Sequence, residues 1–388
     1  DLAAAAPTPH GPALTPSAAP AQARHARNTL AVDACTVLAA FRATPAPLDR
    51  AGALAEGAAR ALRQRLLSDD PVRLDFLLAL LTDCGWLAAD RGRLVINHQA
   101  SSRWLRGTHW EQVTQLFAAW RDSTAWNDLR RVPALRPEGE WRNDPLLPRR
   151  GLLEMLARLD PSAWYRLTDL VAAFKTSDPD FLRPDGNYTG WYLKDAETGL
   201  YLNGFEAWEQ VEGRLLAFLM TGPLYWLGAV ACGTLDEAEP RATVFRLTAW
   251  GEAWLAGGIP AELPRPVRLA VSEDFTVRAP LFCPLLDRFR LLRITEPLVA
   301  AGPEAAGADE RPALGSVTHT RHRITRASLA AARASGIQAQ AVLDFLKRAG
   351  GAPVPARVAA ALGRYDQLGG ALRVTRGAVL RVPDASML

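Results

Sequence analysis

The chain of 388 residues carries 45 Lys and Arg against 41 Asp and Glu, a net charge of +4, and 49% of its residues are hydrophobic. This length predicts two or three domains with a buried core, and the composition is that of a globular protein. No apolar run reaches the roughly 18 residues of a membrane span, so none is predicted. The four cysteines are far apart and form no CxxC pair, which argues against a zinc site or a disulfide framework.

Residues 1–28 are rich in alanine, proline and threonine. They lack the charged start and the continuous apolar stretch of a signal peptide, and they offer too little apolar surface to form a core. We therefore expect a disordered tail or linker here, in a cytoplasmic protein that has no membrane partner.

Residues 29–150 carry the pattern of a winged helix. Two helices are predicted over 28–41 and 51–67, and a third begins after Asp70, whose side chain can cap it. A hairpin follows and turns near Arg91–Gly92. Helices followed by a two-stranded wing are typical of this variant of the helix-turn-helix arrangement.

Residues 151–260 repeat this order. A helix from Trp208 is predicted to stop at Gly222–Pro223, and a strand, a polar turn and a second strand follow. Two Trp-Leu pairs of the first unit have counterparts in the second: Trp86-Leu87 as Trp226-Leu227, and Trp104-Leu105 as Trp254-Leu255. We therefore expect a second winged-helix-like unit.

Residues 261–388 have a different order of elements. A strand over 267–280 and a helix over 281–292 precede a low-complexity stretch, 301–316, which we expect to be a flexible loop. Thr325 can cap the next helix, and two further helices and a terminal strand pair complete the region. The predicted fold class is α+β, with tandem winged-helix-like units followed by a small mixed α/β domain.

This third region resembles the N-terminal domain of XPB-type DNA-repair and transcription helicases, an element that also occurs in bacterial helicase-associated proteins. The matching positions are an acidic-aromatic strand centre, a capped Ser-Leu helix, a Phe-Leu helix, a Pro-Val-Pro turn and a final strand: Glu273, Asp274, Phe275, Ile324, Thr325, Ser328, Leu329, Gly336, Leu343, Phe345, Leu346, Pro353, Val354, Pro355, Leu372 and Val374. Residues 177–213 are also similar to a segment upstream of this element in the bacterial proteins. The chain departs from the family at Ala356-Arg357, where Gln-Asn is usual, and at the 301–316 insertion. The resemblance implies a helicase-associated domain.

The sequence contains no helicase motor. No G-x-x-x-x-G-K-[ST] phosphate-binding loop occurs. The stretch Asp236–Glu239 reads DEAE, like a helicase box, but without that loop it cannot hold magnesium and nucleotide, and a polar hairpin turn is predicted instead. Together with the resemblance, this favours the accessory part of a helicase system.

Basic residues are concentrated in 317–388, which holds eleven Lys and Arg against three Asp, a net of +8. Guanidinium groups with few carboxylates nearby suit phosphate oxygens. Solvated helix faces and a protein partner are the alternatives for these side chains. The candidate nucleic-acid-binding residues are Arg321, Arg323, Arg326, Arg333, Lys347, Arg348, Arg357, Arg364, Arg373 and Arg376.

Helical spacing divides these residues into faces. Arg326 and Arg333 are seven apart and share one face of their helix, and Arg357 and Arg364 repeat the spacing. The small side chains of the first of these helices are predicted to form its packing face, namely Ala327, Ala331 and Ala334.

No other constellation predicts a site. His319 and His322 fall on opposite faces of a predicted strand, so they do not indicate a metal centre, and the acidic residues of 178–185 do not fit a calcium loop. The aromatic rings of 191–213 are predicted to belong to a core or a domain interface. Because no catalytic motif occurs, we predict no catalytic residue, metal, cofactor or small-molecule substrate.

The predicted function is that of a non-catalytic DNA-binding or helicase-recruiting accessory protein in DNA repair, transcription or genome defence. Its expected partners are DNA and a helicase or nuclease. The alternatives are a scaffold subunit that packs on such an enzyme without touching DNA, and an enzyme whose acids and bases converge from distant segments.

We expect the purified chain to hydrolyse no ATP, with or without DNA, because it lacks the loop and lysine that hold the phosphates. A phosphate-release assay checks this. Hydrolysis that persists through a further purification step and is stimulated by DNA would contradict the accessory interpretation.

Overall fold

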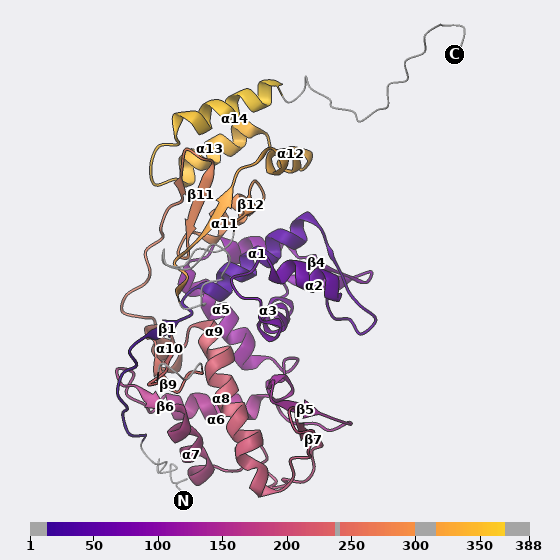
Figure 1. Ribbon diagram of the computed structural model, residues 1–388, viewed down its shortest axis with the longest axis vertical. Coiled ribbons are helices and arrows are strands. Elements are labelled where there is room, and N and C mark those ends of the chain that lie inside the picture. The colour runs from indigo at the N-terminus through magenta and orange to yellow at the C-terminus, as the bar shows by residue number, and fades with distance from the viewer. Residues whose placement is uncertain (1–13, 237–240, 299–315, 369–388) are drawn as a thin grey trace, which may run out of the picture.

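The structure, a computed structural model, describes residues 14–236, 241–298 and 316–368. These residues form a mixed α+β fold with small antiparallel sheets, drawn out along one axis (Figure 1). The expected loop over 301–316 falls almost entirely outside the described residues, and the expected terminal strand pair falls wholly outside them.

The first unit consists of helices around a three-stranded sheet. Its elements are α1 Thr29–Ala43, β2 Ala46–Pro47, α2 Glu56–Arg63, α3 Pro71–Asp83, β3 Leu87–Asp90, β4 Arg93–Ile96, α4 His98–Leu105 and α5 His109–Asp122. The Asp70 carboxylate accepts bonds from the backbone N–H groups of Val72 and Arg73, which confirms the predicted cap of α3. Arg91 and Gly92 both have positive φ, as a two-residue hairpin turn requires, so the predicted turn is also confirmed.

The second unit repeats this order. Its elements are α6 Leu146–Leu156, β6 Tyr165–Arg166, α7 Leu167–Ser177, α8 Arg214–Leu219, α9 Tyr225–Leu227, β8 Val230–Gly233, β9 Val244–Leu247 and α10 Ala249–Leu255. The strand before the hairpin pairs with the second hairpin strand in both units, giving the orders β2-β4-β3 and β6-β9-β8. A small two-stranded sheet of β5 Leu135–Pro137 and β7 Leu193–Asp195 lies beside the repeat.

The predicted stop at Gly222–Pro223 is wrong. The helical segment passes through both residues as a π-helical turn, Met220–Leu224, and ends at Gly228, whose φ is +83°. Proline lacks an N–H group and cannot donate the regular helical hydrogen bond. The wider π turn allows the helix to continue without that bond. Trp226-Leu227 therefore lies at the end of a helix, whereas its counterpart Trp86-Leu87 leads into a strand.

The prediction of a tail over 1–28 differs from the structure over its described part. Residues 23–25 form β1, Ala23–His25, which pairs antiparallel with β8 at the edge of the second unit's sheet. Ser17 forms a bridge with Trp164 of the same unit. Strand addition to an open edge depends on backbone groups rather than on apolar side chains, so the composition of this segment carried no sign of it.

The third region has its own sheet, in the order β10-β11-β13-β12, with helices on one face. Its elements are β10 Ala270–Val271, β11 Thr276–Pro280, α11 Leu285–Leu292, β12 Glu296–Pro297, β13 His319–Arg323, α12 Arg326–Ala334, α13 Ala339–Ala349 and α14 Ala356–Leu368. The strand expected over 267–280 is thus two paired strands. Figure 1 shows α12, α13 and α14 at one end of the molecule, with the sheet between them and α1.

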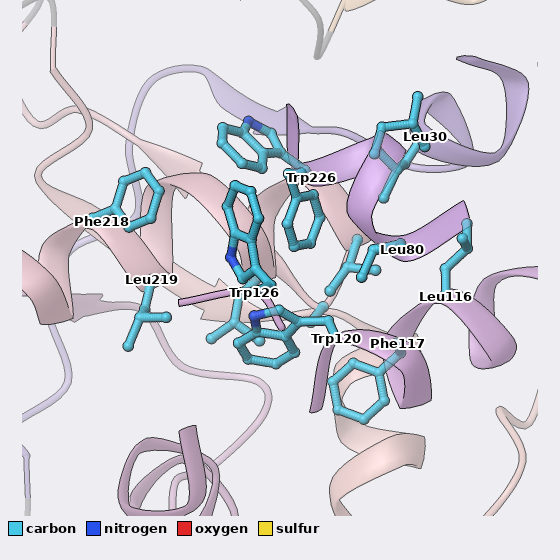
Figure 2. Close-up of a cluster of buried hydrophobic side chains, with 14 of the residues drawn as sticks. Leu30, Leu80, Leu116, Phe117, Trp120, Trp126, Phe218, Leu219 and Trp226 are labelled. Carbon is cyan, nitrogen blue, oxygen red and sulfur yellow. The ribbon is translucent and has the colours of Figure 1, made fainter. Parts of the chain in front are cut away.

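The two repeated units share one hydrophobic core. Phe76 of α3 lies 5.3 Å from Trp126 and 5.4 Å from Trp226 between ring centroids, and Trp226 belongs to the second unit. Figure 2 shows Trp126 between Trp226 and Trp120 in this cluster. Because these rings bridge the two units, neither unit can lose its packing without disturbing the other.

A buried ion pair closes this core. Arg149 of α6 donates to the Asp128 carboxylate at 2.7 Å, and each side chain is 1% exposed. The same guanidinium donates to the carbonyls of Trp120, Ser123 and Trp126, while Asp128 accepts the indole N–H groups of Trp120 and Trp126. The pair thus fixes the end of α5 and the following loop on the first helix of the second unit.

Replacing Arg149→Met should lower the free energy of unfolding by about 3–5 kcal/mol, because it leaves the Asp128 carboxylate buried without its partner. The double variant Arg149→Met/Asp128→Asn removes that charge and keeps an acceptor for the indoles, so it should be more stable than the single variant. Denaturant unfolding measures both.

The exposed pair Arg121–Asp122 provides the control. Arg121→Met should change the free energy of unfolding by less than about 0.5 kcal/mol, because exposed pairs contribute little. Equal losses for Arg149→Met and Arg121→Met would show that the buried pair has no special role.

Candidate nucleic-acid interface

Strand alternation places arginines on the outer face of the third region's sheet. In β13, Thr320 and His322 are buried while Arg321 and Arg323 are exposed. In β11, Arg278 is exposed between two buried residues, and the register sets it directly opposite Arg321. We define the basic sheet face as Arg278, His319, Arg321 and Arg323.

The centre of this face carries uncompensated positive charge. Like charges directly opposite each other on a sheet are destabilising, and the structure describes no carboxylate within 4 Å of Arg278 or Arg321. Partial burial and then these two arginines hold the pKa of His319 below its usual value. Two adjacent guanidinium groups make a fork of donors that suits an anionic oxygen.

Carboxylates reduce the positive charge at one end of the basic sheet face. Arg323 lies 3.8 Å from the Asp274 carboxylate and opposite Glu296 of β12. Asp274 also accepts bonds from the backbone N–H and hydroxyl of Thr276, and these bonds lower its pKa. Exposed ion pairs of this kind contribute little to stability and exchange partners readily. Arg323 is therefore less available to an external anion than Arg278 or Arg321.

The turn between β10 and β11 lies against one residue of α14. Phe275 has a φ of +69°, and its ring lies 6.0 Å from the guanidinium of Arg357 at the start of α14. The turn is next to Asp274, which approaches Arg323. Of the predicted set, the structure thus places Arg321 and Arg323 on the basic sheet face and Arg357 on α14, against Phe275.

The remaining described candidates are exposed but distributed over three helices. Arg326 and Arg333 lie on α12, Lys347 and Arg348 on α13, and Arg364 on α14. Arg348 lines a hollow of about 250 Å³ with Arg290 of α11 and Arg293 just after it, over the helices rather than on the sheet. Arg373 and Arg376 lie outside the described residues.

The packing face predicted for α12 is wrong. Its alanines at 327, 331 and 334 are exposed, whereas Ser328, Leu329 and Ala332 are buried. Thr325 and Ser328 form a reciprocal capping box, and the Ser328 hydroxyl also donates to the Ile294 carbonyl at 2.9 Å. This anchor sets the rotation of the helix, and it leaves Arg326 and Arg333 on the solvent side.

Sequence reasoning missed Arg278, Arg290 and Arg293. Arg278 alternates with buried residues in its strand, which was a usable signal for its exposure. Its position opposite Arg321 depends on a pairing between segments separated by a long insertion, and local sequence carries no information on that register.

The helix that precedes each hairpin is buried rather than offered to a groove. In α3 the side chains of Phe76, Leu77 and Leu80 are fully buried, and the exposed positions include the acidic Asp75 and Asp83. The matching helical segment of the second unit is buried along most of its length. Neither of these two helical segments therefore presents an exposed basic face to DNA.

The remaining reactive groups in the described parts of the chain are side chains of metal-binding types and thiols. No group of three His, Cys, Asp or Glu side chains there could hold a metal ion. Burial raises the pKa of the thiols of Cys84 and Cys232 to about 12 and that of Cys283 to about 11, so these groups stay protonated at neutral pH. Within the same ranges, no helix is both long and apolar enough to cross a bilayer.

Comparison with known proteins adds no identification. No protein-family model matches the chain, and no curated protein sequence is significantly similar to it. The resemblance to helicase-associated domains therefore stays a prediction that rests on the residues quoted for it.

His322 should make folding sensitive to acid. Burial, and then Arg288 and Arg65, lower the pKa of His322 to about 3, whereas in the unfolded chain it keeps its ordinary value of 6.5. The unfolded state therefore binds the proton first, and stability falls as the pH drops from about 6.5 towards 3. Between pH 7.5 and 5 the titration of this one group should lower the free energy of unfolding by about 2 kcal/mol.

His322→Gln removes this titration, so its unfolding free energy should fall less over the same interval. Denaturant unfolding in phosphate-free buffers at both pH values measures the difference. Parallel pH curves for the two proteins would mean that folding does not lower the pKa of His322.

Proposed function

We propose that this chain is a non-catalytic accessory protein that binds nucleic acid through the basic sheet face, in the service of a helicase or nuclease. The observation that carries the proposal is the juxtaposition of Arg278 and Arg321 without a carboxylate nearby. DNA repair, transcription and genome defence are the processes in which such a partner works.

The chemistry of the face favours the phosphate backbone over the bases. Guanidinium groups bind phosphate oxygens through two parallel hydrogen bonds, and such contacts position a protein without reading sequence. The face is a strand pair rather than a helix end. We therefore propose binding without sequence preference.

The repeated units fit a scaffold in this proposal. Their order of helix, strand, two helical segments and hairpin, with the strand orders β2-β4-β3 and β6-β9-β8, supports winged-helix-like units. Since the helix before each hairpin is buried in a shared core, these units would hold the third region rather than read DNA. The third region would be the helicase-associated domain that its sequence resembles.

An exposed apolar surface favours the protein partner. Tyr192, Leu200, Tyr201 and Phe205 are between 46% and 68% exposed, although the sequence predicted that the rings of this segment belong to a core or a domain interface. Clustered apolar side chains of this size on a surface mark interaction sites. We propose that this surface contacts the helicase or nuclease, at a distance along the chain from the basic sheet face.

The double variant Arg278→Gln/Arg321→Gln should weaken binding to duplex DNA of unrelated sequences alike. If each arginine contacts one phosphate, the slope of log K against log salt should become shallower by about 1.8, since each contact contributes about 0.9. Fluorescence anisotropy over a salt series measures affinity and slope together.

The matched control is Arg60→Gln/Arg103→Gln, which removes the same charge from exposed helix positions of the first unit. It should leave the slope unchanged, while both double variants should unfold like the parent protein. Equal slopes for all three proteins would refute the sheet face as the interface, and DNA binding that ignores salt in the parent would favour the scaffold alternative.

A further inference from the structure

A polar cavity lies between the first unit and the third region. Its volume is about 140 Å³, far more than the roughly 10–15 Å³ that one water molecule needs by the same measure. It is walled by residues of α1, the turn after α2, α11 and the inner face of β13, and Figure 1 shows α11 beside α1. The polar side chains of its wall include Asp33, Arg65, Arg288, Thr320 and His322.

Arg288 in this wall is a buried cation without a counter-ion. The described residues contain four buried arginines, and three of them pair with a carboxylate: Arg73 with Asp33, Arg149 with Asp128 and Arg183 with Glu212. Arg288 is 1% exposed, yet it bonds only neutral groups, donating to the Thr320 hydroxyl and to the Ala279 and Pro280 carbonyls. Its Nε–H has no partner.

The nearest acid does not neutralise Arg288. The Asp33 carboxylate accepts from Arg73 on one oxygen and from the Leu67 backbone N–H on the other. The thiols of Cys35 and Cys283 lie close enough to influence the pKa of Arg288, but burial raises their own pKa values and keeps them neutral. Together Asp33, Arg73 and Arg288 leave one net positive charge below the surface, which is costly unless an anion joins it.

Two further groups complete a site for an oxyanion. His322 contacts Thr320 through Nε2 at 2.8 Å, and its Nδ1 is buried without a partner. Arg65 lines the cavity but is itself exposed, so it stands where a ligand would enter. Water could satisfy the free N–H groups, but only an anion also balances the charge.

We propose that this cavity binds a phosphate group, either free phosphate or the terminal group of a small phosphomonoester. The Nε–H of Arg288 and the Arg65 guanidinium would donate to its oxygens, and His322 would lie against it. The site opens on the inner side of the sheet, so it is separate from the basic sheet face and does not depend on the proposed nucleic-acid function.

Isothermal titration of the full chain with inorganic phosphate, and separately with glycerol 3-phosphate, tests this proposal at constant ionic strength. Saturable millimolar or tighter binding is expected, with chloride as the inactive ion. Binding of both ligands identifies a phosphomonoester site, and binding of phosphate alone identifies a site for the free anion. Absence of binding by either ligand overturns the proposal.

Arg65→Gln tests the location, because this exposed side chain can be changed without disturbing the core. It should weaken phosphate binding about tenfold, the loss expected for one charged hydrogen-bond partner. Arg60→Gln, the same change on the same unit but outside the cavity, should leave the affinity within about a factor of two, since an exposed charge at a distance is screened. Equal affinities for the two variants would overturn the assignment.

The variants also separate this site from the nucleic-acid interface. Arg278→Gln/Arg321→Gln should keep phosphate binding, and Arg65→Gln should keep the salt slope of DNA binding. Loss of phosphate binding in the sheet-face variant alone would place the anion on the outer face and overturn the cavity site.

Discussion

The ion pair between Arg149 and Asp128 is the constraint on which the architecture depends. It is buried, and nearly every donor and acceptor of the pair is used. It holds Trp120 and Trp126 through both their backbone and their indole groups, and Trp126 in turn packs on Phe76. A saturated polar cluster of this kind specifies one arrangement of the surrounding apolar side chains, because any other would leave a charge unpaired. The two repeated units are therefore one body.

Polar contacts from two points of the first unit help to attach the third region to that body. Asn28, just before α1, donates to the Leu281 carbonyl, and the His109 ring bonds the Phe282 carbonyl at 2.9 Å. Both carbonyls follow β11 directly. The position of this strand, and with it the basic sheet face, is thus set from the first unit rather than by the small core of the third region alone. The proposed phosphate cavity lies at this same junction.

Local signals predicted local structure well. The Asp70 cap, the Arg91–Gly92 turn and the Thr325 cap each depend on a few neighbouring residues, and the structure has all three. Predictions failed where a distant partner decided the outcome. Residues 23–25 pair with the open edge of a sheet, at β8. The rotation of α12 is set by the hydrogen bond from Ser328 to the Ile294 carbonyl. The pairing of Arg278 with Arg321 likewise needed a register that no local pattern encodes.

The same distinction separates structural from functional arginines in this chain. The abundance of arginine in the sequence carried little information, because the sequence does not distinguish a guanidinium buried on a carboxylate from one that lines a cavity. Arg149 is explained completely by its partners, since its charge and its hydrogen bonds are satisfied within the fold. Arg288 is equally buried but keeps an unused donor and an unbalanced charge, and Arg278 and Arg321 repel each other at the surface. The fold does not neutralise the positive charge of these three residues. A binding partner that carries negative charge would neutralise each of them.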